Sequence, residues 1–245
     1  MRRHTLTAIA ALLAACSGPD PVADHSRLQQ QPAQHDTAPA HRLMLEEIRR
    51  SGPPYVSERV MTVMEKVARH EFVTPRQRRV AYDNRPLPIG AGQTISQPYI
   101  VALMTDLAGV DAESVVLEVG TGSGYQAAVL AELAGHVYTI EIIDMLAERA
   151  AATLDRLGYD NVSVRAGDGY AGWPENAPFD AILVTAAPET VPQPLIDQLA
   201  VGGRLVIPVG PEGRTQILQV LTKLEDGSIN TNNVAPVIFV PFTRD

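Results

Sequence analysis

The chain has 245 residues, of which 45% are hydrophobic, and its formal net charge is −8. This length and composition suit one sizeable core, and the acidic balance argues against a surface that binds duplex nucleic acid while favouring solubility. The single cysteine excludes an internal disulfide framework.

The first residues are typical of an export signal. Two arginines at positions 2 and 3 precede an apolar run over residues 5–15, which at ~1.5 Å rise per residue is too short to span a hydrocarbon core of ~30 Å. Small residues directly precede Cys16, and the segment resembles a bacterial lipobox, in which the cysteine takes a lipid and becomes the N-terminus. We therefore expect a signal peptide over 1–15 and a membrane-anchored lipoprotein facing the periplasm. If the true start lies downstream, for example at Met44, the protein is instead cytoplasmic.

Residues 16–42 are rich in Pro, Gln, Ala, Asp and His and show no apolar periodicity, which predicts a disordered tether. Its histidines at positions 25, 35 and 41 lack the spacing of metal ligands, and we predict no metal site. From Leu43 onward, apolar residues recur at three- and four-residue steps, with a break at residues 51–54. The folded domain is therefore predicted to occupy residues 43–245 and to begin with a helical extension.

A further helix is predicted from Pro98 to Gly109, because proline suits a first turn and Ser96 is placed to cap it. Strands and helices then alternate in the rhythm of a doubly wound parallel sheet. The predicted strands cover residues 114–119, 137–142, 162–165, 181–184 and 205–209, and the predicted helices cover 126–134, 145–157 and 194–199.

The end of the chain has a different pattern. Apolar segments at residues 216–224 and 234–240 flank Asp226-Gly227, which predicts an antiparallel hairpin added to the edge of the sheet. A parallel sheet with a late antiparallel hairpin resembles the S-adenosylmethionine-dependent methyltransferase fold rather than a dinucleotide dehydrogenase. The predicted fold is therefore α/β and Rossmann-like, with a mostly parallel sheet.

A glycine-rich turn follows the first predicted strand. Glycines let the backbone turn sharply and approach a ligand closely, but Tyr125 stands where the dinucleotide fingerprint has its third glycine. S-adenosylmethionine has no phosphate, so the turn need only accept its amino-acid end and ribose. A plain strand-to-helix turn remains the alternative. The candidate cofactor residues here are Glu118, Gly120, Thr121, Gly122, Ser123 and Gly124.

Two more candidates follow the next strands. Glu141 ends the second strand, about 20 residues beyond the first glycine, where an acid can accept hydrogen bonds from both ribose hydroxyls. The alternative is a solvated carboxylate at a strand end. Gly167, Asp168 and Gly169 follow the third strand. Because ligands bind at the carboxyl ends of strands in open parallel sheets, we expect these elements to share one site.

The segment from Gln93 to Pro98 offers two hydroxyls, two amides and a helix N-terminus, a combination suited to binding a carboxylate. Ser96 lacks the G-x-S-x-G context of a hydrolase nucleophile. A helix cap and nothing more is the alternative role for Ser96.

Residues 85–99 and 116–125, in this order and with this separation, resemble protein-L-isoaspartate O-methyltransferases, and the resemblance extends from about Val56 to the C-terminus. It implies transfer of a methyl group from S-adenosylmethionine to the carboxylate of isoaspartyl residues in damaged proteins and peptides. It also implies that Ser96 is the active-site serine and that Asp168 accepts a hydrogen bond from the adenine amine. The implied substrate residues are Thr94, Ile95, Ser96, Ala187, Pro188, Val240 and Pro241.

Such a reaction makes modest chemical demands. A carboxylate is already a nucleophile at neutral pH and a sulfonium methyl is already activated, so alignment and exclusion of water suffice. We expect Ser96 to orient the carboxylate rather than take a proton, and we expect a monomer. Two alternatives stay open: a methyltransferase of the same fold that acts on another carboxylate or small molecule, and a non-catalytic surface lipoprotein that has kept the fold.

Overall fold

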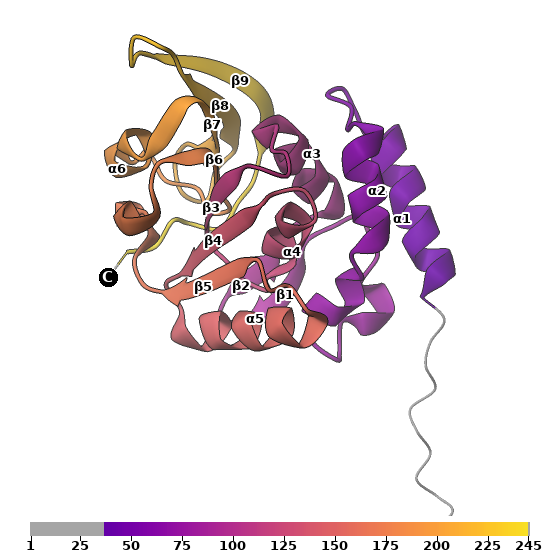
Figure 1. Ribbon diagram of the computed structural model, residues 1–245. Helices are drawn as coiled ribbons and strands as arrows, with labels where there is room; N and C mark the ends of the chain where they lie inside the picture. The colour runs from indigo at the N-terminus through magenta and orange to yellow at the C-terminus, as the bar shows by residue number, and fades with distance from the viewer. Residues whose placement is uncertain (1–36, 245) are drawn as a thin grey trace, which may run out of the picture. The chain divides into compact units, whose positions relative to one another are not determined.

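The computed structural model describes residues 37–244, which belong to one compact unit (Figure 1). The predicted signal peptide, Cys16 and most of the predicted tether lie outside the described residues. Among the helices that the structure describes, none has the length and apolar character needed to cross a membrane.

A seven-stranded sheet with the order β5-β4-β3-β6-β7-β8-β9 forms the centre of this unit. The strands β3 to β7 are parallel, and β8 and β9 continue the sheet as an antiparallel hairpin, so the predicted fold class is confirmed. Their bounds are β3 Val115–Val119, β4 His136–Glu141, β5 Val162–Ala166, β6 Phe179–Val184, β7 Leu199–Val209, β8 Gln216–Lys223 and β9 Ile229–Val237.

Helices cover both faces of the sheet, because alternate strand residues point to opposite sides. In β6, Ala181 and Leu183 belong to the larger apolar cluster, which includes residues of α1 (Ala38–Arg50), α2 (Glu58–Lys66) and α3 to α5. Ile182 and Val184 belong to a second cluster with Leu195 of α6. Figure 1 shows α6 on the side of the sheet away from α3 and α4. The helices are α3 Pro98–Ala108, α4 Tyr125–Ala131, α5 Asp144–Leu157 and α6 Gln193–Asp197.

The helical extension begins earlier than predicted. Helix α1 covers Ala38–Arg50, so the boundary between tether and domain at residue 42 is too late. Pro39 is favourable in a first helical turn, and His41 is held in place: its ring stacks on Tyr82 at 4.5 Å, and its Nε2 donates to the carbonyl of Met64 at 2.9 Å. The prediction that His41 lies in a solvated linker is therefore wrong.

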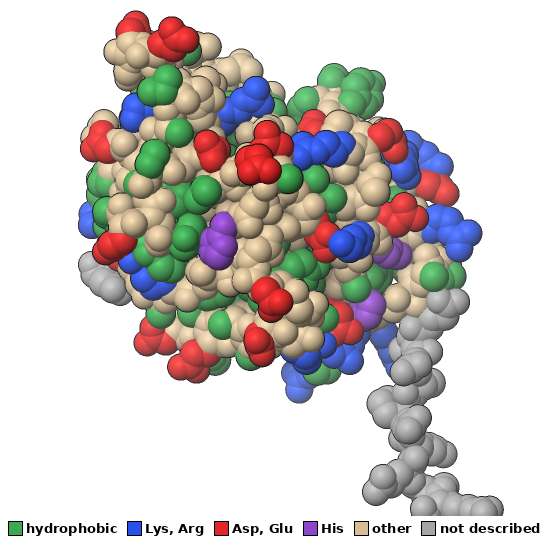
Figure 2. Space-filling model, in the orientation of Figure 1, with side chains coloured by type: hydrophobic (Ala, Val, Ile, Leu, Met, Phe, Trp, Pro, Cys, Tyr) green, Lys and Arg blue, Asp and Glu red, His purple; other side chains and the backbone are tan. Residues whose placement is uncertain are grey.

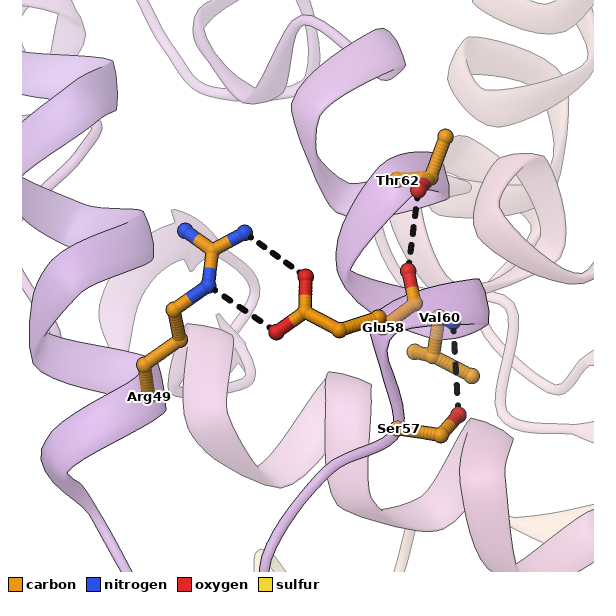
Figure 3. Close-up of polar contacts among 5 residues, drawn as sticks. All are labelled: Arg49, Ser57, Glu58, Val60 and Thr62. Carbon is orange, nitrogen blue, oxygen red and sulfur yellow. Dashed lines mark hydrogen bonds and ion pairs between the residues drawn. The ribbon is translucent and has the colours of Figure 1, made fainter.

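Helix α2 (Glu58–Lys66) packs beside α1, and an exposed ion pair joins them. Figure 3 shows Arg49 of α1 donating to both carboxylate oxygens of Glu58, at 3.2 and 3.0 Å. The side chain of Ser57 accepts from the backbone N–H of Val60 and caps α2. Two short 3₁₀ helices follow, η2 at Arg69–Phe72 and η3 at Arg78–Val80.

A small hairpin that we did not predict precedes α3. Its strands β1 (Leu87–Gly90) and β2 (Gln93–Ile95) pair antiparallel across Ala91 and Gly92, whose φ angles are +50° and +72°. Two successive positive φ angles are typical of a tight two-residue hairpin turn. The guanidinium of Arg149 in α5 donates to the carbonyl of Ile89 at 2.7 Å and ties the hairpin to the main domain.

Several predicted boundaries need correction. Strand β7 begins at Leu199 rather than residue 205 and runs through Gly202; its pairing with β6 has a register shift between Phe179 and Ala181 of β6. Strand β9 begins at Ile229 rather than residue 234 and ends at Val237. Helix α4 ends at Ala131 rather than residue 134.

Figure 2 shows the turn between β8 and β9 projecting from the sheet with acidic side chains at its tip.

Candidate active site

A pocket of about 770 Å³, open to solvent, lies at the carboxyl ends of β3, β4 and β6. Strand β2, the segment after β9, the loop after β5 and residues of α3 and α4 also contribute to its walls. Its lining includes Gln93, Thr94, Ile95, Ser96, Glu118, Gly120, Thr121, Gly122, Ser123, Gln126, Glu141, Ile142, Ile143, Gly169, Thr185, Ala186, Val240, Pro241, Phe242 and Thr243. The structure therefore brings most of the predicted cofactor and substrate residues to one place.

The glycine turn after β3 adopts a backbone that other residues rarely reach. Gly120, Gly122 and Gly124 have φ angles of +98°, +54° and +85°. A Cβ at Gly120 would lie 2.3 Å from the hydroxyl of Thr185, which itself donates to the carbonyl of Gly120 at 2.6 Å. Larger side chains are therefore disfavoured at these positions both by the backbone conformation and, at Gly120, by the contact with Thr185.

Glu141, at the end of β4, is almost fully buried beside this turn. Its Oε2 accepts from the backbone N–H of Gly122 at 2.7 Å, and its Oε1 accepts from that of Ile143 at 3.0 Å. The alternative of a solvated carboxylate is therefore wrong. Each carboxylate oxygen has a second lone-pair site, so Glu141 can still accept two hydrogen bonds from a ligand in the pocket.

Glu118 of β3 also lines the pocket and is fully buried. Its Oε2 accepts from the hydroxyl of Thr139 at 2.5 Å, whereas its Oε1 has no hydrogen-bond partner among the described residues. The pKa of the Glu118 carboxyl is raised to about 8, chiefly by burial; the hydrogen bond from the Thr139 hydroxyl opposes this rise, and the nearby Glu141 adds to it. A buried acceptor without a donor is costly, so this oxygen calls for an N–H group from a ligand.

The loop after β5 contributes less than predicted to the lining. Gly169 lines the pocket, and a Cβ there would lie 2.4 Å from Val119. Gly167 and Asp168 are not among the lining residues. Both carboxylate oxygens of Asp168 are engaged, one by the backbone N–H of Tyr170 at 2.9 Å and one by Arg244 at 3.2 Å.

Ser96 lies between β2 and α3 and does not cap the helix. Gln97 occupies the cap position, and the backbone N–H of Tyr99 donates instead to the side chain of Asn84 at 3.0 Å. The prediction that Ser96 caps the helix is therefore wrong. Within the part of the chain that the structure describes, the Ser96 hydroxyl makes no hydrogen bond, and Ser96 lines the pocket.

The segment after β9 meets the end of β6 as the sequence reading implied. The backbone N–H of Ala187 donates to the carbonyl of Val240 at 2.8 Å, and that of Phe242 donates to the carbonyl of Ala187 at 3.1 Å. Val240 and Pro241 line the pocket; Ala187 is buried beside them, and Pro188 is not part of the lining.

Several lining residues were not predicted. Thr185 directly follows β6, so the rule that ligands bind at the carboxyl ends of parallel strands could have found it. Phe242 and Thr243 carry no comparable signal, because only the return of the chain after β9 brings them to the pocket.

A second, wider hollow of about 1280 Å³, also open to solvent, adjoins the pocket. The two share Thr94, Ser96, Thr185 and Val240. The other residues of this groove are Pro86, Gln97, Ile100, Thr215, Pro236, Val237, Ile238 and Phe239. None of these is charged, and most are apolar.

No group of three or more His, Cys, Asp or Glu side chains within residues 37–244 is arranged to hold a metal ion. The arrangement instead joins a pocket with two buried carboxyls to a wider groove. Thr94 and Ser96, whose hydroxyls make no hydrogen bond among the described residues, line both hollows.

Residues 40–245 match the sequence profile of the family described as protein-L-isoaspartate(D-aspartate) O-methyltransferase. The chain is 63% identical over 193 residues to protein-L-isoaspartate O-methyltransferase 2 of Polaromonas sp. strain JS666, covering 79% of this chain and 92% of that protein. It is 58% identical over 189 residues to protein-L-isoaspartate O-methyltransferase of Gloeobacter violaceus, covering 77% and 92%.

A solved structure from Plasmodium falciparum, named as a protein-L-isoaspartate O-methyltransferase and determined in complex with S-adenosyl-L-homocysteine, is 27% identical with a TM-score of 0.71. The match covers 84% of this chain and 99% of that one. With the fold and the sequence in agreement over nearly all of the described residues, this chain belongs to the protein-L-isoaspartate(D-aspartate) O-methyltransferase family.

Proposed function

We propose that this chain transfers a methyl group from S-adenosylmethionine to the free carboxylate of L-isoaspartyl residues in damaged proteins and peptides. The observation that carries the proposal is the shared wall of Thr94 and Ser96, which line both the pocket and the adjoining groove. A methyl donor bound in the pocket and a polypeptide bound in the groove would meet at these two hydroxyls.

The pocket residues fit S-adenosylmethionine, which when bound supplies an activated methyl group on a sulfonium. Glu141 has two acceptor sites left for the ribose hydroxyls, and Gly120 and Gly122 of the turn line the pocket beside it, where the amino-acid end would lie. The unpaired Oε1 of Glu118 suits the ammonium group, because a charge-assisted hydrogen bond satisfies a buried carboxyl well.

Ser96 is assigned the role of orienting the substrate carboxylate. Its hydroxyl has no competing partner among the described residues, so it can donate to one carboxylate oxygen and leave the other to attack the methyl carbon. No general base is needed because the nucleophile is ionised at neutral pH. The rate therefore depends on alignment of the carboxylate with the methyl group and on exclusion of water.

The open groove favours a polypeptide over a small molecule. It is the wider of the two hollows, and its walls from β9 and α3 carry apolar side chains that can contact residues beside the isoaspartyl group. Methylation of an isoaspartyl hexapeptide should therefore be far more efficient than methylation of small dicarboxylic acids at equal concentration. Faster turnover of a small carboxylate would replace this function by the alternative, a small-molecule methyltransferase.

We further propose that the protein is exported and anchored to a membrane through a lipid on Cys16, and that it acts as a monomer. The support for the anchor is the apolar run and the small residues before the only cysteine. Mass spectrometry of protein from its native host should find Cys16 as the N-terminus with added acyl mass. An unmodified chain starting at Met1 or Met44 in the soluble fraction would contradict the anchor. Light scattering of the purified protein measures its oligomeric state, and a dimer mass would contradict the monomer.

A further inference from the structure

After β9 the chain turns back across the carboxyl end of the sheet. Residues 238–244, which we call the C-terminal strap, leave the sheet edge and pair with Ala187 beyond β6 through two backbone hydrogen bonds. Four strap residues, Val240 to Thr243, line the pocket. The strap is therefore a wall of the site. Besides this pairing, the backbone N–H of Phe239 donates to the side-chain oxygen of Gln216 at 3.0 Å where the strap begins.

The far end of the strap is tied to the opposite wall. The Nε of Arg244 donates to Oδ2 of Asp168 at 3.2 Å, and the guanidinium carbon lies 3.8 Å from the centre of the Tyr170 ring. The ring of Phe242 meets the ring of Tyr170 edge-on, with centroids 6.4 Å apart. Three contacts thus join the strap to the loop that contains Gly169, a lining residue.

The three contacts reinforce one another because all of them are made with Asp168 or Tyr170. An exposed ion pair alone contributes little, and the Arg244 side chain is 55% exposed. Stacking of a guanidinium on an aromatic ring adds to it, because arginine can pair with a carboxylate and cover a ring at the same time. The pair also restrains Asp168, whose other oxygen accepts from the N–H of Tyr170.

We infer that Arg244 is a positioning residue for the methyl donor: by clamping the strap to Asp168 and Tyr170, it holds this wall of the pocket against bound S-adenosylmethionine and slows its release. The inference rests on the proposed function in one respect, namely that this pocket binds the donor. Arg244 touches neither donor nor substrate in this account; it acts through the strap and through the loop at 168–170.

The test is the rate at which radiolabelled S-adenosylmethionine leaves the full chain after a chase with unlabelled donor. Arg244→Ala should raise the release rate about fivefold, since an ion pair and a cation–π contact are lost together. Arg244→Lys keeps the charge but not the planar stacking, and should raise the rate only about twofold. Thermal melting of each variant should stay close to that of the wild type.

Salt gives a second readout that a merely structural role would not change. Between about 0.1 M and about 1 M salt the screening length falls from ~10 Å to ~3 Å, which weakens exposed ion pairs. Release from the wild type should accelerate over this range, and release from Arg244→Ala should not. The matched control is Arg49→Ala, which removes another exposed arginine–carboxylate pair, the one in Figure 3, on helices whose residues do not line the pocket. It should leave release unchanged.

Release from Arg244→Ala that matches the wild type, or is slower, would overturn the inference while leaving the proposed function intact. Slower release would mean that Arg244 competes with the donor for Asp168. A wild-type chain that retains no labelled donor at all would overturn both the inference and the proposed function.

Discussion

Asn84 and Tyr99 share a hydrogen bond in which the backbone N–H of Tyr99 donates to the Asn84 side-chain oxygen at 3.0 Å. Asn84 precedes the β1–β2 hairpin, and Tyr99 is in the first turn of α3. The carbonyl of Asn84 also accepts from the side chain of Gln97 at 3.0 Å. A residue distant in sequence thus satisfies the start of the helix, and the hydroxyl of Ser96 stays free for the pocket.

Replacing Asn84 by alanine should lower the free energy of unfolding by about 1 kcal/mol, the usual cost of losing a helix cap. Chemical denaturation of the two proteins measures this difference. Asn84→Asp keeps the acceptor and should be close to the wild type. If Asn84→Ala is as stable as the wild type, this hydrogen bond does not act as the cap.

Ser96→Ala, in contrast to Asn84→Ala, should lower catalytic activity and leave stability unchanged. We expect unchanged stability, because Ser96 does not cap α3, and nearly unchanged donor affinity. Turnover of an isoaspartyl peptide should fall about tenfold to hundredfold in kcat/KM, since one hydrogen bond to a charged group contributes about 1.5–3 kcal/mol. Steady-state kinetics and thermal melting on one sample check both parts. If Ser96→Ala retains the wild-type kcat/KM, Ser96 does not orient the carboxylate, and Thr94 or backbone amides must do so.

Glu141→Ala should weaken S-adenosylmethionine binding at least tenfold, or about 1.4 kcal/mol, because two acceptors for the ribose are lost. The same change frees the N–H groups of Gly122 and Ile143, so the melting temperature should fall as well. Glu141→Gln is the matched control, since it retains one acceptor oxygen and most of the shape. If calorimetry finds that Glu141→Ala binds S-adenosylmethionine with unchanged affinity, Glu141 does not contact the bound cofactor.

Glu118 should make the stability of the ligand-free protein depend on pH. Burial raises the pKa of its carboxyl from the ordinary 4.5 to about 8, so the folded state favours the protonated form. The stabilisation of the folded state by the protonated Glu118 is fully present below pH 4.5, the ordinary pKa of a glutamate. It is lost as the pH rises from 4.5 towards about 8, because the unfolded chain ionises the carboxyl over this range before the folded protein does. Glu118→Gln, which resembles the neutral acid, should lack this loss. Thermal melts over this range in both proteins test it; parallel curves would show that Glu118 is ionised throughout.

Much of the fold was predictable because apolar runs and glycines mark buried parallel strands and their turns. The ends of β3 and β4 were placed nearly correctly, and this brought Glu118 and Glu141 to one edge of the sheet. The β1–β2 hairpin was missed because its four- and three-residue strands are too short to show a period. Its turn at Gly90 to Gly92 was the available signal.

Other features depend on tertiary context. The first half of β9, Ile229 to Asn233, is polar because it forms an exposed sheet edge, so hydrophobicity gives no indication of a strand. Arg244 lies 76 residues from Asp168, and no local pattern connects them. The cap of α3 was assigned to Ser96 because propensity favours a nearby serine, whereas a distant asparagine provides the hydrogen bond.

The most direct measurement of the central claim uses the purified full chain, radiolabelled S-adenosylmethionine and two peptides that differ only in an isoaspartyl or an aspartyl linkage at one position. The account predicts that label enters the isoaspartyl peptide as a base-labile methyl ester, that the aspartyl peptide stays unlabelled, and that Ser96→Ala lowers the rate. Equal labelling of both peptides, or labelling of neither by a chain that binds the donor, would contradict it.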